Sequence, residues 1–278
     1  MPASLTPDDL QHVDNVLADT SMPSHSRRAL LQRTAAGALA AGVASIAAPA
    51  ALGASRTSNA DSVQSVLDTA ITAEALAVAF LDELIKRLST GGSLAGKPAS
   101  QSPLIDVLRA AGAAEFDHFA ALQSLGAKPL ATQVFIPDAL FGDGGVKTFQ
   151  NIELFEALFV NAYLVAITVF GDANQGKFAR YAGEILGTEA EHRVLARFAQ
   201  NTIGPNTGHV ANDRAFEVYK FKSLTPIVQQ IVGLGVGIGK QGKGAGKTYS
   251  ALTKKPSTFS TIFGNKPDPV FPLANIKR

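Results

Sequence analysis

Two pairs of a glutamate and a histidine, each three residues apart, are the clearest chemical signal in this sequence. Glu115 precedes His118, and Glu189 precedes His192 within the stretch GEILGTEAEHRVLAR at 183–197. Residues three apart on a helix share one face, with about 5–6 Å between their Cβ atoms. Each pair could therefore direct a carboxylate oxygen and an imidazole nitrogen at the same metal ion.

Two more glutamates occupy apolar helical stripes. Glu74 lies between Ile71 and Val78, and Glu156 lies on the apolar face of the helix predicted over 147–170. A carboxylate that faces a core needs a partner there. We therefore expect each of these residues to supply one further ligand.

Glu153, one turn before Glu156, is the alternative candidate for the ligand from the helix over 147–170. A hairpin loop centred on Asn174 lies 18 residues after Glu156 and 15 residues before Glu189, about 27 Å and 22 Å along a helix. Glu153 lies 21 residues before the same point, about 32 Å, which is further from level with Glu189. This comparison favours Glu156 as the ligand and leaves Glu153 to hydrogen-bond beside the site.

The candidate ligands form two matching halves, each with one glutamate from a first helix and Glu-x-x-His from the next. The set is Glu74, Glu115, His118, Glu156, Glu189 and His192. Four-helix bundles hold two metal ions with this arrangement. The four carboxylates would balance two divalent ions, and without metal they should repel one another and take up protons.

Composition narrows the chemistry further. The chain has 278 residues, 46% of them hydrophobic, and no cysteine. Much of the hydrophobic share is alanine, which favours helix. The lack of cysteine excludes disulfides, thiolate nucleophiles and thiolate metal sites, so a metal site must use imidazole, carboxylate or hydroxyl groups. Such donors suit iron, manganese or zinc.

The apolar residues repeat with a helical period over about 61–90, 102–125, 147–170 and 178–200. The short loop at 171–176 predicts an antiparallel return between the last two helices. Residues 127–147 lack a strong period and contain two prolines, which suits a crossover from one end of a bundle to the other. We therefore predict an all-α fold over 55–202, a four-helix bundle with a long crossover between helices 2 and 3.

Residues 1–54 have the pattern of a polar leader followed by an export signal. Arg27 and Arg28 are followed after one spacer by two leucines, and then by an Ala/Gly-rich run over 35–54. This resembles a twin-arginine signal. A membrane anchor is the alternative, but Pro49 interrupts the run. We expect the twin-arginine translocase to export the protein to the periplasm, the cell surface or the medium.

Residues 203–278 form a basic, Gly- and Lys-rich extension that carries 11 Lys and Arg against 3 Asp and Glu, a net charge of +8, whereas 55–202 carries −5. Short helices are expected at 215–221 and 226–234.

Two glycine motifs, at 237–242 and 242–248, match a dinucleotide fingerprint and most of a phosphate-binding loop. No βαβ pattern surrounds either motif, so we reject both. The extension has few aromatic residues, and no specific nucleic acid is expected as a partner.

With these six ligands and the twin-arginine segment, the chain resembles the ferritin-like di-iron carboxylate superfamily over about residues 60–200, and within it the exported group related to desiccation-associated proteins. The resemblance implies two iron ions, or manganese, bridged by Glu115 and Glu189, with Glu74 and Glu156 as terminal ligands. Tyr163, two turns after Glu156, could lie near the metals. Homo-oligomerisation is left open.

Two functions are compatible with this sequence. The first is redox chemistry with O₂ or peroxide, by a ferroxidase-like or catalase-like di-iron or di-manganese oxidoreductase that protects against stress. The second is a non-catalytic stress or cell-surface protein that uses a ferritin-like scaffold for structure or interaction. The complete ligand set favours the first function. The basic extension keeps the second one open.

Overall fold

The computed structural model describes residues 61–101, 103–204, 211–212 and 215–259, which all belong to one compact unit. The predicted leader and twin-arginine segment, residues 1–54, lie outside the described residues. Within the described part, the prediction of a mostly helical fold is confirmed.

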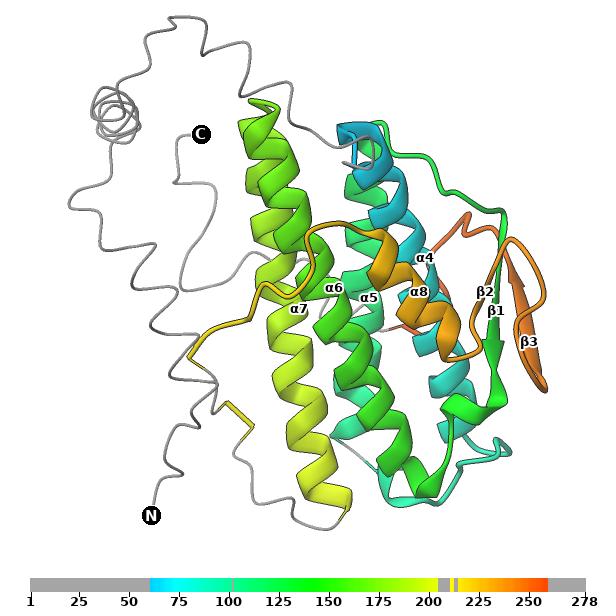
Figure 1. The fold of residues 1–278 in the computed structure, drawn as a ribbon. Coiled ribbons are helices and arrows are strands. Elements are labelled where there is room, and N and C mark those ends of the chain that lie inside the picture. Colours follow the sequence, from blue (N-terminus) through cyan, green and yellow to red (C-terminus); the bar gives the residue numbers. More distant parts are fainter. Residues whose placement is uncertain (1–60, 102, 205–210, 213–214, 260–278) are drawn as a thin grey trace, which may run out of the picture. The chain divides into compact units, whose positions relative to one another are not determined.

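Four long helices lie side by side (Figure 1). They are α4 (Val63–Leu88), α5 (Leu104–Ser124), α6 (Val146–Asp172) and α7 (Gly176–Ile203). Helix α4 packs mainly against α5 and helix α6 mainly against α7, so the sequence-adjacent helices form two hairpins. The expected short loop joins α6 to α7, and the buried apolar residues of all four helices form one continuous core.

The helix ends follow local rules of backbone chemistry. At the start of α4, the side chain of Ser62 accepts from the amide of Ser65, and the side chain of Ser65 accepts from the amide of Ser62. This reciprocal capping satisfies two donors that the first turn leaves unpaired. Gly145 precedes α6 with φ of 111°, and a Cβ there would lie 2.2 Å from the Cβ of Ala99. Only glycine fits that position, because the backbone is left-handed and closely approached.

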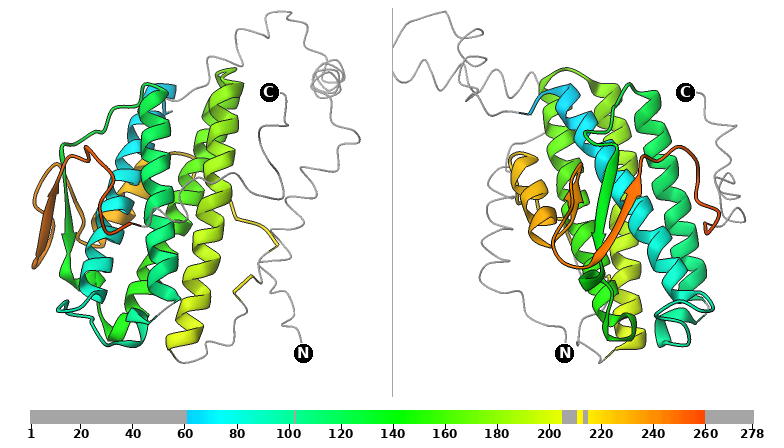
Figure 2. Two further views of the ribbon diagram at one scale, coloured as in Figure 1. Left: turned by 180° about the vertical axis from the view of Figure 1, so that it is seen from behind. Right: turned by 90° about the vertical axis from the view of Figure 1, so that its right-hand side faces the viewer.

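The segment between α5 and α6 runs from one end of the helices to the other, as the sequence predicts, but it also contains a strand (Figure 1). Strand β1 (Gln133–Pro137) is the centre of a small antiparallel sheet with β2 (Gly237–Ile238) and β3 (Gly246–Ser250), in the order β2-β1-β3. Figure 2 shows the sheet lying against α4, on the side away from α7. The expected all-α class is therefore incomplete, because residues far apart in the sequence pair to form this sheet.

The sheet also explains the two glycine motifs. Cβ atoms added at Gly237, Gly242 and Gly246 would lie 2.1 to 2.4 Å from backbone oxygens of neighbouring segments. These glycines therefore allow close packing of the backbone around β1. Both strand pairings are antiparallel, so neither motif lies in a βαβ unit within the described residues.

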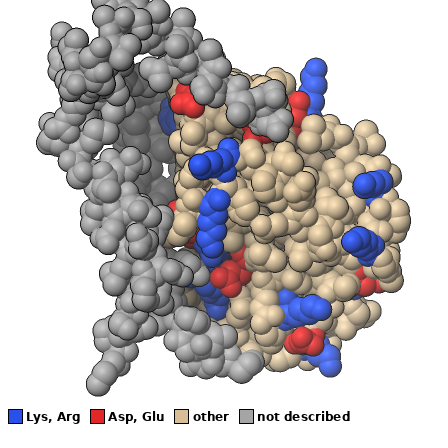
Figure 3. Space-filling view, viewed as in Figure 1, with Lys and Arg blue, Asp and Glu red and all other residues tan. Residues whose placement is uncertain are grey.

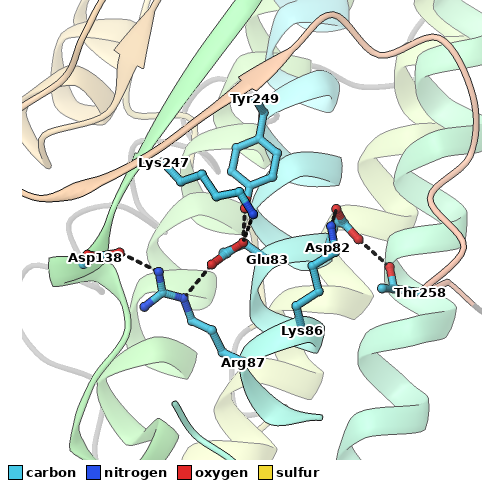
Figure 4. A network of polar contacts seen from close by, with 8 residues as sticks. All are labelled: Asp82, Glu83, Lys86, Arg87, Asp138, Lys247, Tyr249 and Thr258. Carbon is cyan, nitrogen blue, oxygen red and sulfur yellow. Dashed lines mark hydrogen bonds and ion pairs between the residues drawn. The ribbon is translucent and has the colours of Figure 1, made fainter. Parts of the chain in front are cut away.

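A network of charged and hydroxyl groups attaches β3 and the residues after it to α4 (Figure 4). Glu83 accepts from Tyr249 and lies 3.2 Å from the ammonium of Lys247 and 3.0 Å from Nε of Arg87. Burial alone would raise the pKa of Glu83, but these hydrogen bonds outweigh it and lower the pKa. Asp82, the residue just before Glu83 on α4, accepts from Thr258 at 2.6 Å. Part of the basic extension is thereby fixed to the helices by its own lysine and hydroxyl groups.

The remaining described residues of the extension also pack on the long helices. Helix α8 (Thr225–Gly233) corresponds to the short helix expected at 226–234 and contacts α6. The prediction of a short helix at 215–221 is wrong, because this segment has no helical structure. Its backbone hydrogen-bonds to a side chain instead: the amide of Lys220 donates to Oδ1 of Asn161 at 2.8 Å.

Two described stretches, α4 and Asp143–Asp172, are long and apolar enough to cross a membrane by length and composition. In each, 56% of the most apolar window is buried inside the fold. Core helices that pack against other helices have the same properties, so length and composition alone do not identify a membrane span.

Candidate metal centre

The structure brings all six predicted ligands together, although they come from four different helices. Glu74 lies on α4, Glu115 and His118 on α5, Glu156 on α6, and Glu189 and His192 on α7. The side chains of Glu74, Glu115 and Glu189 are at most 1% exposed. This is an unusual concentration of charged groups for a protein interior, where charges need a partner of opposite sign.

The six residues form two groups that overlap. One group is Glu74, Glu115, His118 and Glu189, and the other is Glu115, Glu156, Glu189 and His192. Within each group the potential ligand atoms all lie within 4.8 Å of one another. Only Glu115 and Glu189 belong to both groups. Each of these two carboxylates could therefore contact two metal ions at once.

Both imidazoles turn Nδ1 toward the shared carboxylates. Nδ1 of His118 lies 3.3 Å from Glu115 on its own helix and 3.2 Å from Glu189 on α7. Nδ1 of His192 lies 3.7 Å from Glu189 on its own helix and 2.8 Å from Glu115 on α5. The two halves are thus related by an approximate twofold exchange of α5 with α7, as the matching spacing in the sequence predicts.

Several of these buried atoms have no hydrogen-bond partner. They are Glu74 Oε2, Glu115 Oε1, Glu156 Oε2, both carboxylate oxygens of Glu189, and His192 Nδ1. The 2.8 Å approach of His192 Nδ1 to Glu115 is an ion-pair distance without the alignment of a hydrogen bond. Buried polar atoms in proteins are almost always paired, so this cluster calls for an explanation. Atoms that converge on a common point without pairing fit a metal ion placed between them.

The electrostatics divide the four carboxyl groups into two kinds. Burial and the neighbouring carboxylate of Glu189 raise the pKa of Glu74 and Glu156 well above the usual range. Burial also disfavours the charge on Glu115 and Glu189, but the two imidazoles outweigh it and lower the pKa of both shared carboxyl groups. Without metal, the terminal pair therefore holds its protons to a higher pH than the shared pair does.

The pKa values of both imidazoles are raised, whereas those of the shared carboxyl groups are lowered. Burial would lower the pKa of His192, but the charge of the Glu115 carboxylate 2.8 Å away raises the pKa to about 10. Burial would also lower the pKa of His118, but the hydrogen bond to Glu115 and the nearby carboxylates of Glu189 and Glu74 raise it well above its usual value. Two imidazolium groups thus neutralise the two shared carboxylates when no metal is bound.

The two terminal positions differ in their surroundings. The hydroxyl of Tyr163 on α6 donates a hydrogen bond to Glu74 Oε1 on α4. The sequence suggests that this tyrosine lies near the metals, but it does not show that its partner comes from the opposite hairpin. At the other terminal position, Leu81 and Glu156 line the same cavity of about 100 Å³, together with His192 and apolar residues of α5 and α7. One terminal carboxylate therefore has a phenol beside it, and the other borders an apolar cavity.

Glu153 lies outside the cluster. Its carboxylate accepts a hydrogen bond from Gln200 Nε2 at 3.0 Å and lies 3.9 Å from the guanidinium of Arg193, both on α7. Glu156 is 4% exposed and belongs to one of the two ligand groups. The structure therefore brings Glu156, and not Glu153, level with Glu189.

Comparisons of this chain with models of known protein families, with curated proteins and with solved structures found no match.

Proposed function

We propose that this protein is an exported metalloprotein with a ferritin-like four-helix bundle, whose two iron or manganese ions carry out redox chemistry with O₂ or peroxide and protect against stress. The observation that carries the proposal is the pair of overlapping ligand groups that share Glu115 and Glu189. A cluster with one terminal carboxylate and one imidazole on each side of two shared carboxylates offers matched positions for two ions.

The donor set fits these metals. Four carboxylates and two imidazoles are hard or intermediate ligands, and the chain has no cysteine to offer a soft one. Two divalent ions would be neutralised by the four carboxylates, and they would satisfy the buried oxygen and nitrogen atoms that lack hydrogen-bond partners. When bound, such a pair of ions supplies one-electron redox steps that side chains alone do not provide.

The protein's own groups have three roles in this proposal. The apolar core around the four helices excludes bulk water, which strengthens every electrostatic interaction in the site. Burial and the charge of Glu74 raise the pKa of Tyr163, so its hydroxyl keeps its proton and orients the Glu74 carboxyl. The cavity beside Glu156 and His192 is lined by apolar residues and is large enough for a small uncharged molecule such as O₂ or hydrogen peroxide.

Glu156 and Glu153 form a matched pair of variants that tests this function. Glu156→Ala should hold at most one ion per chain and should lose O₂ or peroxide consumption, because a terminal ligand is missing. Glu153→Ala should keep two ions, with turnover within about tenfold of the wild type, because it removes only a group outside the cluster. Metal analysis and an oxygen or peroxide electrode measure both. If a wild-type protein loaded with two ions consumes neither oxidant, the function is non-catalytic.

Export is the second part of the proposal, and it rests on the sequence at Arg27 and Arg28. A route that moves folded proteins would let the buried site take up its metals before export. Changing both arginines to lysine should keep the precursor inside the cell, because the route recognises paired guanidinium groups. Immunoblotting of cell fractions measures this. Arg33→Lys, just outside the pair, is the control and should be exported normally; export of the double variant at the wild-type level would refute the proposal.

A further inference from the structure

A second, larger cavity lies between α4, α6 and α8, with a volume of about 250 Å³. Its inner wall consists of buried apolar side chains, among them Val66 and Leu76 of α4 and Phe159 of α6. At its rim are two exposed residues, Leu130 and Lys240. Figure 3 shows charged side chains scattered over this side of the molecule, around a broad uncharged area in its middle. The metal chemistry proposed above uses no part of this cavity except the ring of Tyr163.

The cavity reaches the edge of the metal centre. Tyr163 forms part of the wall, and the hydroxyl of the same residue donates to Glu74. The inner end of a molecule bound there would therefore be separated from a terminal ligand by one phenol ring. The smaller cavity of about 100 Å³ lies at the other terminal position, beside Glu156. The structure thus has two separate apolar spaces, each next to one half of the cluster.

The size of the larger cavity limits what it can hold. Apolar cavities of about 150 Å³ bind benzene, and sites for drug-sized molecules begin at roughly 300 Å³. A space of about 250 Å³ therefore suits a single narrow chain better than a molecule with several rings. Its polar surface is negligible, so the bound part of the ligand must be hydrocarbon.

The residues at the rim indicate which chemical group of a bound molecule would lie at the mouth of the cavity. Among the described residues, Lys240 is the only charged one that lines the cavity, and it forms no ion pair with another of them. Its ammonium is therefore available to an anion at the mouth. We propose that this cavity binds an anionic single-chain amphiphile of the fatty-acid type, with the carboxylate at Lys240 and the hydrocarbon chain directed toward Tyr163. The inference goes beyond the proposed redox function, because the binding needs no metal ion.

Titration calorimetry of the full chain with straight-chain carboxylates tests the proposal. Each added methylene from hexanoate to decanoate should strengthen binding by about fourfold, because each one leaves water for the apolar wall. Lys240→Gln should weaken decanoate binding by about three- to fivefold and leave decanol binding unchanged, because only the charged head uses the ammonium. Lys243→Gln, an exposed lysine that does not line the cavity, is the matched control and should bind like the wild type.

Two variants that fill the cavity locate the binding site. Ala70→Phe from α4 and Val228→Phe from α8 should each abolish measurable binding, and the second keeps the test valid if the first does not fold. Metal content is measured on the same samples, so loss of the metals and loss of ligand binding are distinguished. The proposal is overturned if affinity does not depend on chain length, if Lys240→Gln binds decanoate as the wild type does, or if both filled variants still bind it.

Discussion

Replacing Glu115 and Glu189 together by alanine should leave the purified protein without bound metal, whereas the wild type should hold up to two iron or manganese ions per chain. These two carboxylates are the only residues that belong to both ligand groups, so their loss removes two donors from each metal position at once. Each ion would then keep only one terminal carboxylate and one imidazole as ligands. Two ligands are too few to retain the ion against a chelator. Metal analysis after gel filtration measures the stoichiometry.

A pair of glutamates elsewhere on α7 is the matched control. Glu184 and Glu191 are exposed, and their replacement by alanine should leave the metal content unchanged. Circular dichroism shows whether each variant is folded. If the alanine double variant does not fold, Glu115→Gln keeps the shape of the side chain and should still lower the metal content. Two ions per chain in a folded variant that lacks both shared carboxylates would refute the assignment of the site.

Metal loading should release protons, up to four per chain, and this is the second large effect that we expect. Without metal, the pKa values of Glu74, Glu156, His118 and His192 are all raised, so each of these four groups holds its proton to a higher pH than usual. Two divalent ions need all four carboxylates ionised and both imidazoles neutral. The total charge of the cluster is zero in either state, since four protons are exchanged for two divalent ions.

The sign of the pH dependence follows from this exchange. Lower pH keeps the protons in place and weakens metal binding, and higher pH strengthens it, by up to about 100-fold per ion for each pH unit when two protons leave for each ion bound. The slope should decrease near the pKa of His192, which is about 10, because that imidazole then has no proton to release. Calorimetry in two buffers with different heats of ionisation counts the protons. A release near zero would show that the cluster is already deprotonated, contrary to the geometry of its ion pairs.

The four long helices and the six clustered residues could both be predicted from the amino-acid sequence alone. The reason is that both signals are local. Apolar residues at a helical period predict a helix within a window of about three turns, and a glutamate three residues before a histidine places both on one face. The choice of Glu156 over Glu153 needed only the rise per residue on either side of a short loop. None of these inferences required knowledge of which helices pack together.

The contacts that join distant segments of the chain could not be predicted in this way. The sheet pairs β1, in the middle of the crossover, with strands of two and five residues more than a hundred positions later. Strands so short and rich in glycine show no alternating pattern in the sequence. Tyr163 donates to Glu74 across 89 residues, and Lys240 reaches a cavity whose walls come from three helices. Local spacing carries no information about such contacts, because they depend on how the helices and the extension pack.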